Sequence, residues 1–434
     1  MHNFTLPLVL CVLLGCSSES KPDDTAMTTT ETSSQSNTTT GTTQTTGTTI
    51  GTTTTTNTTT ETTETADTGT KTTETTDTGA APTDPAVTAF EANITDLLTL
   101  AGAPGAQAAL IKDGETVWSW NFGMANLEDG VPVTSETSFP LASVSKTVTG
   151  TALMQVYDTG AFELDDPIGP HLGFDVTHPA SAAPITFRHL LTHTAGIRDN
   201  WDIMPYSEGD PTVALGDYLE DYLDPDGDLY NASRNYSTWG PGDGFSYSNI
   251  GVALAGHLVE AITGIDFNDW CRDRIFEPLS MEHTGWYLSD LDDALVAHPH
   301  DCYSGPCRTL RHYGYADYPD GMLRASAEDM ARFLAMTEQG GSLDGHLILK
   351  EETVAQMLTL QVPSQGQALI WYEANQGGEV FWGHNGGDIG VSTNMFVRKD
   401  DGVGYLFWLN GELSSWGPIT EATAAMLRAA DTLF

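Results

Sequence analysis

The sequence predicts an α/β domain built on an antiparallel five-stranded sheet that is flanked by helices and carries an inserted, helix-rich subdomain. Three observations support this fold class. Strand-like runs gather near the two ends of the globular region, a helical stretch lies at each end of that region, and the long middle part is rich in helices and loops. We therefore expect one globular domain over residues 86–434, with a sheet assembled from both ends of the chain.

Five segments have the composition of strands. They are residues 107–111, 116–122, 379–382, 391–398 and 402–409. The first two flank an Asp-Gly pair, which is a strong signal for a tight hairpin, and a second Asp-Gly pair precedes the last segment. The segments therefore predict two antiparallel groups of neighbouring strands.

Helical spacing of apolar residues marks the two ends of the domain. Residues 87–101 place Phe90, Ile94 and Leu98 on one face, and residues 418–433 form a second helical stretch. We expect both helices to cover one face of the sheet. The inserted subdomain is expected between residues 143 and 360.

The charge of the chain limits its partners. Its 434 residues include 17 Lys and Arg against 59 Asp and Glu, for a formal net charge of -42. Such a surface repels phosphate backbones and anionic lipids, so nucleic acid is excluded as a partner.

The first 85 residues differ from the rest. Residues 1–16 have the short apolar run of an export signal and end in Leu-Leu-Gly-Cys, which is similar to a lipobox and implies lipidation of Cys16. An ordinary secretory signal is the alternative. Residues 17–85 are mostly Thr with few apolar side chains and are expected to form a disordered stalk. We therefore expect an exported protein that contacts a membrane only through its N-terminal lipid.

Export places the cysteines in an oxidising environment. Cys302 and Cys307 flank four residues and are expected to form a disulfide, whereas Cys271 is expected to be a buried helix residue. No cysteine spacing indicates a metal site. The acidic segment 224–228 lacks the later Glu of a calcium loop, and His189 and His193 lack the intervening Glu of a zinc helix.

The first candidate catalytic motif is Ser143-Val144-Ser145-Lys146, which precedes an apolar helical stretch. A separation of three places Ser143 and Lys146 on one helical face. The positive end of the helix is expected to lower the pKa of Lys146, and a lysine with a pKa near neutral can take a proton from serine. Alone, this motif more often describes a helix-capping serine beside a solvated lysine.

A second motif, Tyr247-Ser248-Asn249, directly precedes another apolar helix. Tyr247 is a second candidate base as a phenolate stabilised by Lys146, although an isolated tyrosine is more often a packed aromatic residue. Asn249 offers amide donors and an acceptor.

The third motif, His384-Asn385-Gly386-Gly387, lies on a strand-like run. Its glycines allow a substrate backbone to approach the strand edge. The amide of Gly387 is expected to join that of Ser143 as a pair of oxyanion donors. Taken alone, His384 would be structural.

In this order, the three motifs resemble those of the serine β-lactamase and penicillin-binding-protein superfamily, in particular its class C β-lactamase-like branch, which includes D-alanyl-D-alanine carboxypeptidases and esterases. Further stretches that resemble this branch are residues 164–168, 185–197, 277–284 and 319–330. The resemblance covers about residues 86–434 and implies a β-lactamase/transpeptidase-like fold.

The resemblance also implies roles for the motif residues. Ser143 is then the nucleophile, and Lys146 takes its proton alone or together with Tyr247. Tyr247 also protonates the leaving group and activates the hydrolytic water. Asn249 holds the substrate amide or orients Lys146, and the third motif lines the edge of the cleft. The branch needs neither a metal nor a cofactor.

One departure bears on the substrate. β-Lactamases of this branch have Lys-Thr-Gly at the third motif, where the lysine helps to bind a carboxylate, but this chain has His384-Asn385-Gly386. Unperturbed histidine is largely neutral at pH 7. We therefore expect a small peptide, amide or ester substrate, including cell-wall peptide, with an activity of the D-Ala-D-Ala carboxypeptidase or esterase type. A β-lactamase is the alternative within the enzyme class, and a catalytically silent binding module is the alternative outside it.

Overall fold

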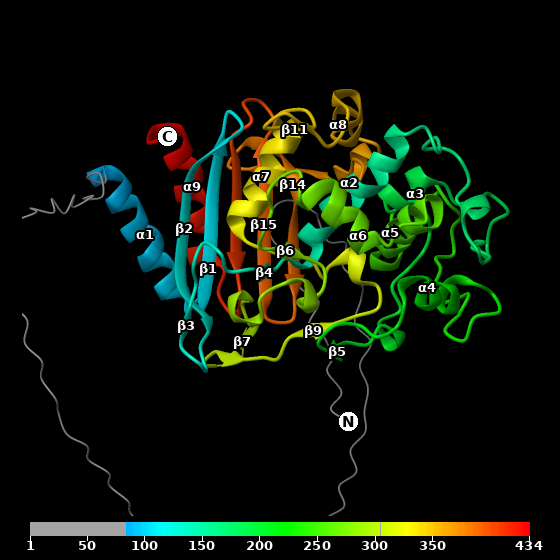
Figure 1. Cartoon of the computed structure of the whole chain (residues 1–434), viewed down its shortest axis with the longest axis horizontal. Coiled ribbons are helices and arrows are strands. Elements are labelled where there is room, and N and C mark those ends of the chain that lie inside the picture. The colour runs from blue at the N-terminus through cyan, green and yellow to red at the C-terminus, as the bar shows by residue number, and fades with distance from the viewer. Residues whose placement is uncertain (1–83, 304) are drawn as a thin grey trace, which may run out of the picture. The chain divides into compact units, whose positions relative to one another are not determined.

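The computed structural model describes residues 84–303 and 305–434, and its main feature is a seven-stranded antiparallel sheet (Figure 1). The strand order is β13-β14-β15-β16-β1-β2-β3. The bounds are β1 Gly105–Lys112, β2 Glu115–Asn126, β3 Val131–Pro132, β13 Tyr372–Gln376, β14 Glu379–Asp388, β15 Val391–Arg398 and β16 Gly404–Leu409. The five predicted strands form its continuous centre, and β13 and the short β3 add one strand at each edge.

The two ends of the chain meet in the centre of this sheet. Strand β1 pairs with β16 in a register that places Ala106 opposite Leu409, and it also pairs with β2 across the predicted Asp-Gly turn. Closing the sheet in this way joins segments about 300 residues apart, and the long middle segment leaves the sheet after β3 at one edge and returns through β13 at the other.

Helices cover both faces of the sheet. The terminal helices α1, Pro85–Ala101, and α9, Gly417–Thr432, pack together on one face, as predicted (Figure 1). Ala106, Ala108 and Leu110 of β1 belong to the core beneath them, whereas Ala109 and Ile111 belong to the core on the opposite face. This alternation follows from the two-residue period of a strand. Helix α7, Ala327–Glu338, packs on the second face.

The middle of the chain is rich in helices and short strands. Its helices besides α7 are α2 Ser145–Asp158, α3 Phe187–Leu191, α4 Leu215–Leu223, α5 Asn249–Thr263, α6 Phe267–Cys271 and α8 Glu351–Met357. Its short strands form small separate sheets, one of which also includes β17, Glu412–Leu413, from near the C-terminus. The short strands of the middle segment are β4 Phe139–Pro140, β5 Ser207–Glu208, β6 Thr284–Gly285, β7 His300–Cys302, β8 Arg308–Thr309, β9 Tyr313–Gly314, β10 Arg324–Ala325, β11 Ser342–Leu343 and β12 His346–Leu347. Helices α2 and α5 pack against each other and form the centre of this helical part.

Cys302 and Cys307 form a disulfide, and Cys271 is buried as a free thiol in α6. In the part of the chain that the structure describes, no single helix is both long and apolar enough to cross a membrane. Only the pair 249–263 and 267–276, bent by 86°, has the required length and composition together. The predicted signal segment, Cys16 and nearly all of the predicted stalk lie outside the described residues.

Candidate active site

Ser143 lies in a single 3₁₀ turn, Ala142–Val144, that leads directly into α2. The preceding residue, Ala142, has a φ of 48°, a conformation that costs free energy for any residue with a side chain. Such strain tends to persist where a functional group must be held in place. The turn places Ser143 beside strand β14, and Lys146 follows one helical turn later in α2.

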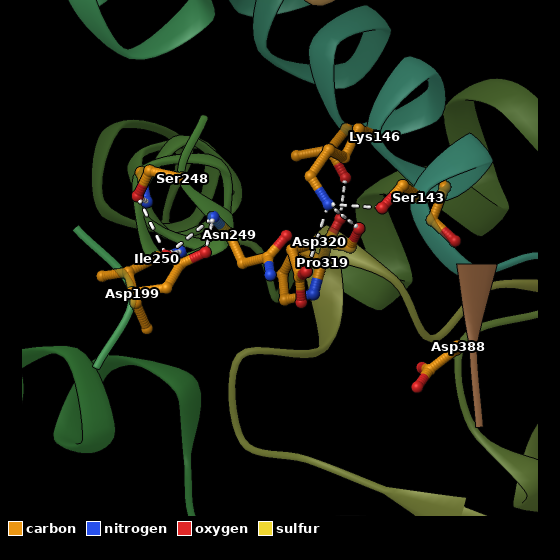
Figure 2. Close-up of polar contacts among 12 residues, drawn as sticks. Ser143, Lys146, Asp199, Ser248, Asn249, Ile250, Pro319, Asp320 and Asp388 are labelled. Carbon is orange, nitrogen blue, oxygen red and sulfur yellow. Dashed lines mark hydrogen bonds and ion pairs between the residues drawn. The ribbon is translucent and has the colours of Figure 1, made fainter. Parts of the chain in front are cut away.

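Lys146 is completely buried, and its ammonium group contacts three oxygen atoms (Figure 2). It donates hydrogen bonds to Ser143 Oγ at 3.1 Å, to the backbone oxygen of Asp320 at 2.6 Å and to Asp320 Oδ2 at 3.2 Å. The predicted pair of Ser143 and Lys146 is therefore brought together by the helical spacing. Sequence reasoning had not singled out Asp320, which forms an ion pair with the lysine.

The acidic partner changes the expected ionisation of the lysine. Burial lowers the pKa of Lys146, but Tyr247 and the carboxylate of Asp320 raise it, and the net pKa lies above its ordinary value. The prediction of a near-neutral lysine is therefore wrong for the free protein. That prediction was based on the positive end of the helix and did not include the carboxylate of Asp320. Burial in turn raises the pKa of Asp320 to about 6, although the charge of Lys146 lowers it.

Tyr247 precedes α5 and packs on both histidines of the site. Its ring centroid is 4.4 Å from that of His193 and 6.2 Å from that of His384, and Lys146 Nζ lies 5.1 Å from the Tyr247 centroid. The residue as a whole remains 40% exposed. Burial raises the pKa of Tyr247, although Lys146 and Ser143 lower it in part, so a phenol is the resting form at neutral pH.

Asp199 caps the start of α5 and fixes the second motif. Its carboxylate accepts hydrogen bonds from the backbone of Asn249 at 2.9 Å and of Ile250 at 3.2 Å, and from Ser248 Oγ at 3.2 Å (Figure 2). Such a cap satisfies amides that the first helical turn leaves unpaired. Within the described residues no hydrogen bond joins the side chain of Asn249 to Lys146. Asn249 instead lines the cavity beside the nucleophile.

Strand β14 presents the third motif at an open edge. Its partner β13 pairs only as far as Gly383, so the described part of the chain places no strand against this edge from His384 onward. Gly386 lies close to the nucleophile turn, because a Cβ atom there would be 3.0 Å from the backbone nitrogen of Ser143 and closer still to Thr393 Oγ1 and the Leu141 oxygen. Only glycine therefore fits between the strand and the turn.

The side chains of the third motif carry no positive charge at neutral pH. His384 is 3% exposed, and its Nδ1 lies 2.6 Å from the backbone oxygen of Asn385. Burial, followed by the charge of Lys146, lowers the pKa of His384 to about 3. Asn385 Oδ1 accepts a hydrogen bond from the hydroxyl of Tyr372 at 2.6 Å.

A cavity opens beside Ser143. Gly387, the predicted second oxyanion donor, lies in its wall together with Ser143. The remaining lining residues are Ala142, Trp201, Met204, Tyr206, Asn249, Tyr315, Asp317, Asp320, Gly321 and Asp388. The motifs predicted from sequence therefore meet at one place, and the carboxylates around them are the residues that sequence reasoning missed.

The histidines and acidic loop considered as metal ligands have other contacts. His189 Nδ1 accepts a hydrogen bond from the amide of Thr186 in the cap of α3, and His193 packs under Tyr247. Asp224 accepts hydrogen bonds from the amides of Asp175 and Asp226. Across residues 84–303 and 305–434, no group of three His, Cys, Asp or Glu side chains is arranged to hold a metal ion.

Comparison with known proteins agrees with this geometry. A family model described as Beta-lactamase matches residues 90–430. A β-lactamase of Yersinia enterocolitica is 28% identical over 65% of this chain and 68% of its own length. Penicillin-binding protein 4 of Amycolatopsis lactamdurans is also 28% identical, over 72% of this chain and 82% of its own length. The fold is similar to that of an octameric penicillin-binding protein homologue from Pyrococcus abyssi, with a TM-score of 0.62 and 23% sequence identity. The similarity covers 79% of this chain and 77% of that homologue.

Proposed function

This chain belongs to the β-lactamase family of serine hydrolases, and we propose that it is an exported member that cleaves a small amide or ester through an acyl-enzyme on Ser143. The activity lies in the range of D-Ala-D-Ala carboxypeptidases and esterases. The observation that carries the proposal is the 3.1 Å contact between Lys146 Nζ and Ser143 Oγ. It occurs in a buried site that faces an open strand edge.

The proposed reaction uses the groups already described. Ser143 Oγ attacks the substrate carbonyl while its proton passes to the deprotonated amine of Lys146, alone or together with Tyr247, whose hydroxyl passes its own proton on to that amine. The negative charge that develops on the carbonyl oxygen is held by the amides of Ser143 and Gly387. Tyr247, a phenol at rest, protonates the leaving group, and water then releases the acyl group from Ser143.

The same site gives a reason to rank a β-lactamase second. β-Lactams carry a carboxylate, and the third motif offers a neutral His384 where β-lactamases of this branch have a lysine. The similarity to the Yersinia enterocolitica β-lactamase keeps this activity as the second candidate. Turnover of a chromogenic cephalosporin at a rate that exceeds turnover of p-nitrophenyl esters and a D-Ala-D-Ala peptide would favour it.

A serine-directed fluorophosphonate tests the mechanism. We expect the probe to label wild-type protein and the exposed-serine control Ser289→Ala equally, and to leave Ser143→Ala unlabelled. Equal labelling of Ser143→Ala would exclude Ser143 as the nucleophile. Absence of labelling in the wild type, together with absence of turnover, would favour a silent binding module.

Export and lipid attachment form a separate part of the proposal. They rest on the apolar run and the Leu-Leu-Gly-Cys sequence that ends at Cys16. In a bacterial host, we expect the full chain in the membrane fraction and the Cys16→Ala variant outside it. Equal distribution of the two forms would exclude a lipid on Cys16.

A further inference from the structure

The cavity beside Ser143 has an unusual wall, because carboxylates and aromatic rings make up half of it. The carboxylates come from two separate segments of the chain, the turn at residues 317–320 and the end of β14, and all border the same space. They belong to Asp317, Asp320 and Asp388. Figure 2 shows Asp320 beside Lys146, and Asp388 at the end of the β14 strand beyond Ser143.

Among the described residues, only Asp320 of these three has a positively charged partner. Asp317 is only 3% exposed, and no side chain in the described residues donates a hydrogen bond to it. Asp320 bonds to Lys146 through Oδ2, but its Oδ1 is buried without any partner. Asp388 accepts hydrogen bonds from the hydroxyls of Tyr206 at 2.7 Å and Tyr315 at 3.3 Å. The described ion pairs include neither Asp317 nor Asp388, so one lysine faces three carboxylates.

A buried carboxylate without a counter-charge is unfavourable. Burial raises the pKa of all three groups above their ordinary range, and the pKa of Asp317 is raised well above it, with further repulsion from Asp320. A cation bound in the cavity would supply the counter-charge that these carboxylates lack. A metal ion does not fit, because the described residues contain no group of three ligands in a suitable arrangement.

Two further features of the cavity favour an organic cation. Three of its lining residues, Trp201, Tyr206 and Tyr315, are aromatic, and aromatic rings stabilise a nearby ammonium group. Trp201 is 53% exposed, so its ring lies where a ligand enters from solvent. The formal net charge of -42 also raises the concentration of cations near the whole surface.

The position of the cavity indicates which part of the substrate it receives. It includes Gly387 and Asp388 but neither His384 nor Asn385, so it lies toward one end of the open edge of β14. Tyr247, which protonates the leaving group in the proposed reaction, does not line the cavity. The cavity therefore lies on the acyl side of the bond to be cleaved.

We propose that this cavity binds a primary ammonium group on the acyl part of the substrate. The preferred substrates are then amides or esters whose acyl group carries a free amine close to the scissile carbonyl, as in an amino-acid amide. This inference rests on the proposed serine hydrolase activity and specifies its substrate class. Asp317 and Asp388 are the residues expected to contact the ammonium group.

The test compares alanine p-nitroanilide with N-acetylalanine p-nitroanilide, in both D and L forms, at pH 7. The free amine is expected to have at least a tenfold higher kcat/KM than the acetylated compound. In Asp317→Asn and Asp388→Asn this ratio is expected to fall toward one. The exposed-surface control Asp228→Asn removes one charge outside the cavity and is expected to keep the wild-type ratio.

A second measurement avoids reliance on variants that fail to fold. Propylammonium chloride is expected to slow fluorophosphonate labelling of the wild type at concentrations at which propanol, at matched ionic strength, has no effect. Equal effects of the two compounds, or a preference for the acetylated substrate, would overturn the ammonium site. Loss of labelling altogether would instead overturn the hydrolase activity, so the two failures are distinguishable.

Discussion

The ion pair between Lys146 and Asp320 leads to a sharp prediction for the substitution Asp320→Asn. The variant retains the backbone oxygen that accepts a hydrogen bond from Lys146 at 2.6 Å, but it removes the negative charge at 3.2 Å. At an effective dielectric constant of about 20, that charge stabilises the ammonium by roughly 5 kcal/mol, which is an upper figure because the carboxylate itself has a raised pKa. We expect the pKa of Lys146 to fall by about one to three units.

The pH dependence of acylation reports this shift. Only a neutral Lys146 accepts the proton of Ser143, so the second-order rate of fluorophosphonate labelling should increase with pH until the lysine is deprotonated. We expect the rate to rise with pH in both proteins, and the rising limb of the Asp320→Asn profile to lie at least one pH unit below that of the wild type. The control Asp228→Asn should follow the wild type. A profile of Asp320→Asn that coincides with the wild type, or moves to higher pH, would refute the reasoning.

Three other substitutions test separate parts of the structure. Gly386→Ala should reduce labelling of Ser143 about 100-fold or more, because its Cβ forces the strand that carries Gly387 away from the turn that carries Ser143 and separates the two oxyanion donors; labelling within threefold of wild type would contradict this. Because burial holds the folded-state pKa of His384 at about 3, below its unfolded value of about 6.5, its contribution to stability is present above pH 6.5 and lost as pH falls toward 3. Thermal unfolding of His384→Gln should therefore depend less on pH across that window than unfolding of the wild type. Replacing Cys302 and Cys307 by serine should lower the free energy of unfolding by about 2 kcal/mol, from the closure entropy of so short a loop, as measured by denaturant unfolding, with unchanged labelling.

The parts of the site that sequence predicts are those set by local spacing. Ser143 and Lys146 come together because one helical turn separates them, and Asn249 begins α5 because apolar spacing starts there. The Asp-Gly hairpins likewise locate the central strands. Strand β13, with the sequence Tyr-Glu-Ala-Asn-Gln, lacks a clear apolar alternation and was not predicted, since its pairing depends on β14 rather than on its own composition.

The parts that sequence does not predict depend on closure of the fold. Asp320 contacts Lys146 across 174 residues, and no local pattern indicates which segment returns to the lysine. The same holds for Asp317 and Asp388, which come from different elements and meet only at the cavity. The helix end was visible in the sequence, but the approach of Tyr247 and Asp320, which raise the pKa of Lys146, was not.

The acidic cavity and the charged lysine have a common consequence for catalysis. In the free protein, Asp320 holds Lys146 as an ammonium ion, which is the wrong form to take a proton from Ser143. An ammonium group of a substrate bound by Asp317 and Asp388 would bring a second positive charge into the cavity that Asp320 borders, and repulsion between the two cations would lower the pKa of Lys146. A correct substrate would then activate the base as it binds. The rate of acylation by amine-bearing substrates should therefore exceed that of neutral esters by more than tighter binding alone explains, and the excess should appear in kcat rather than in KM.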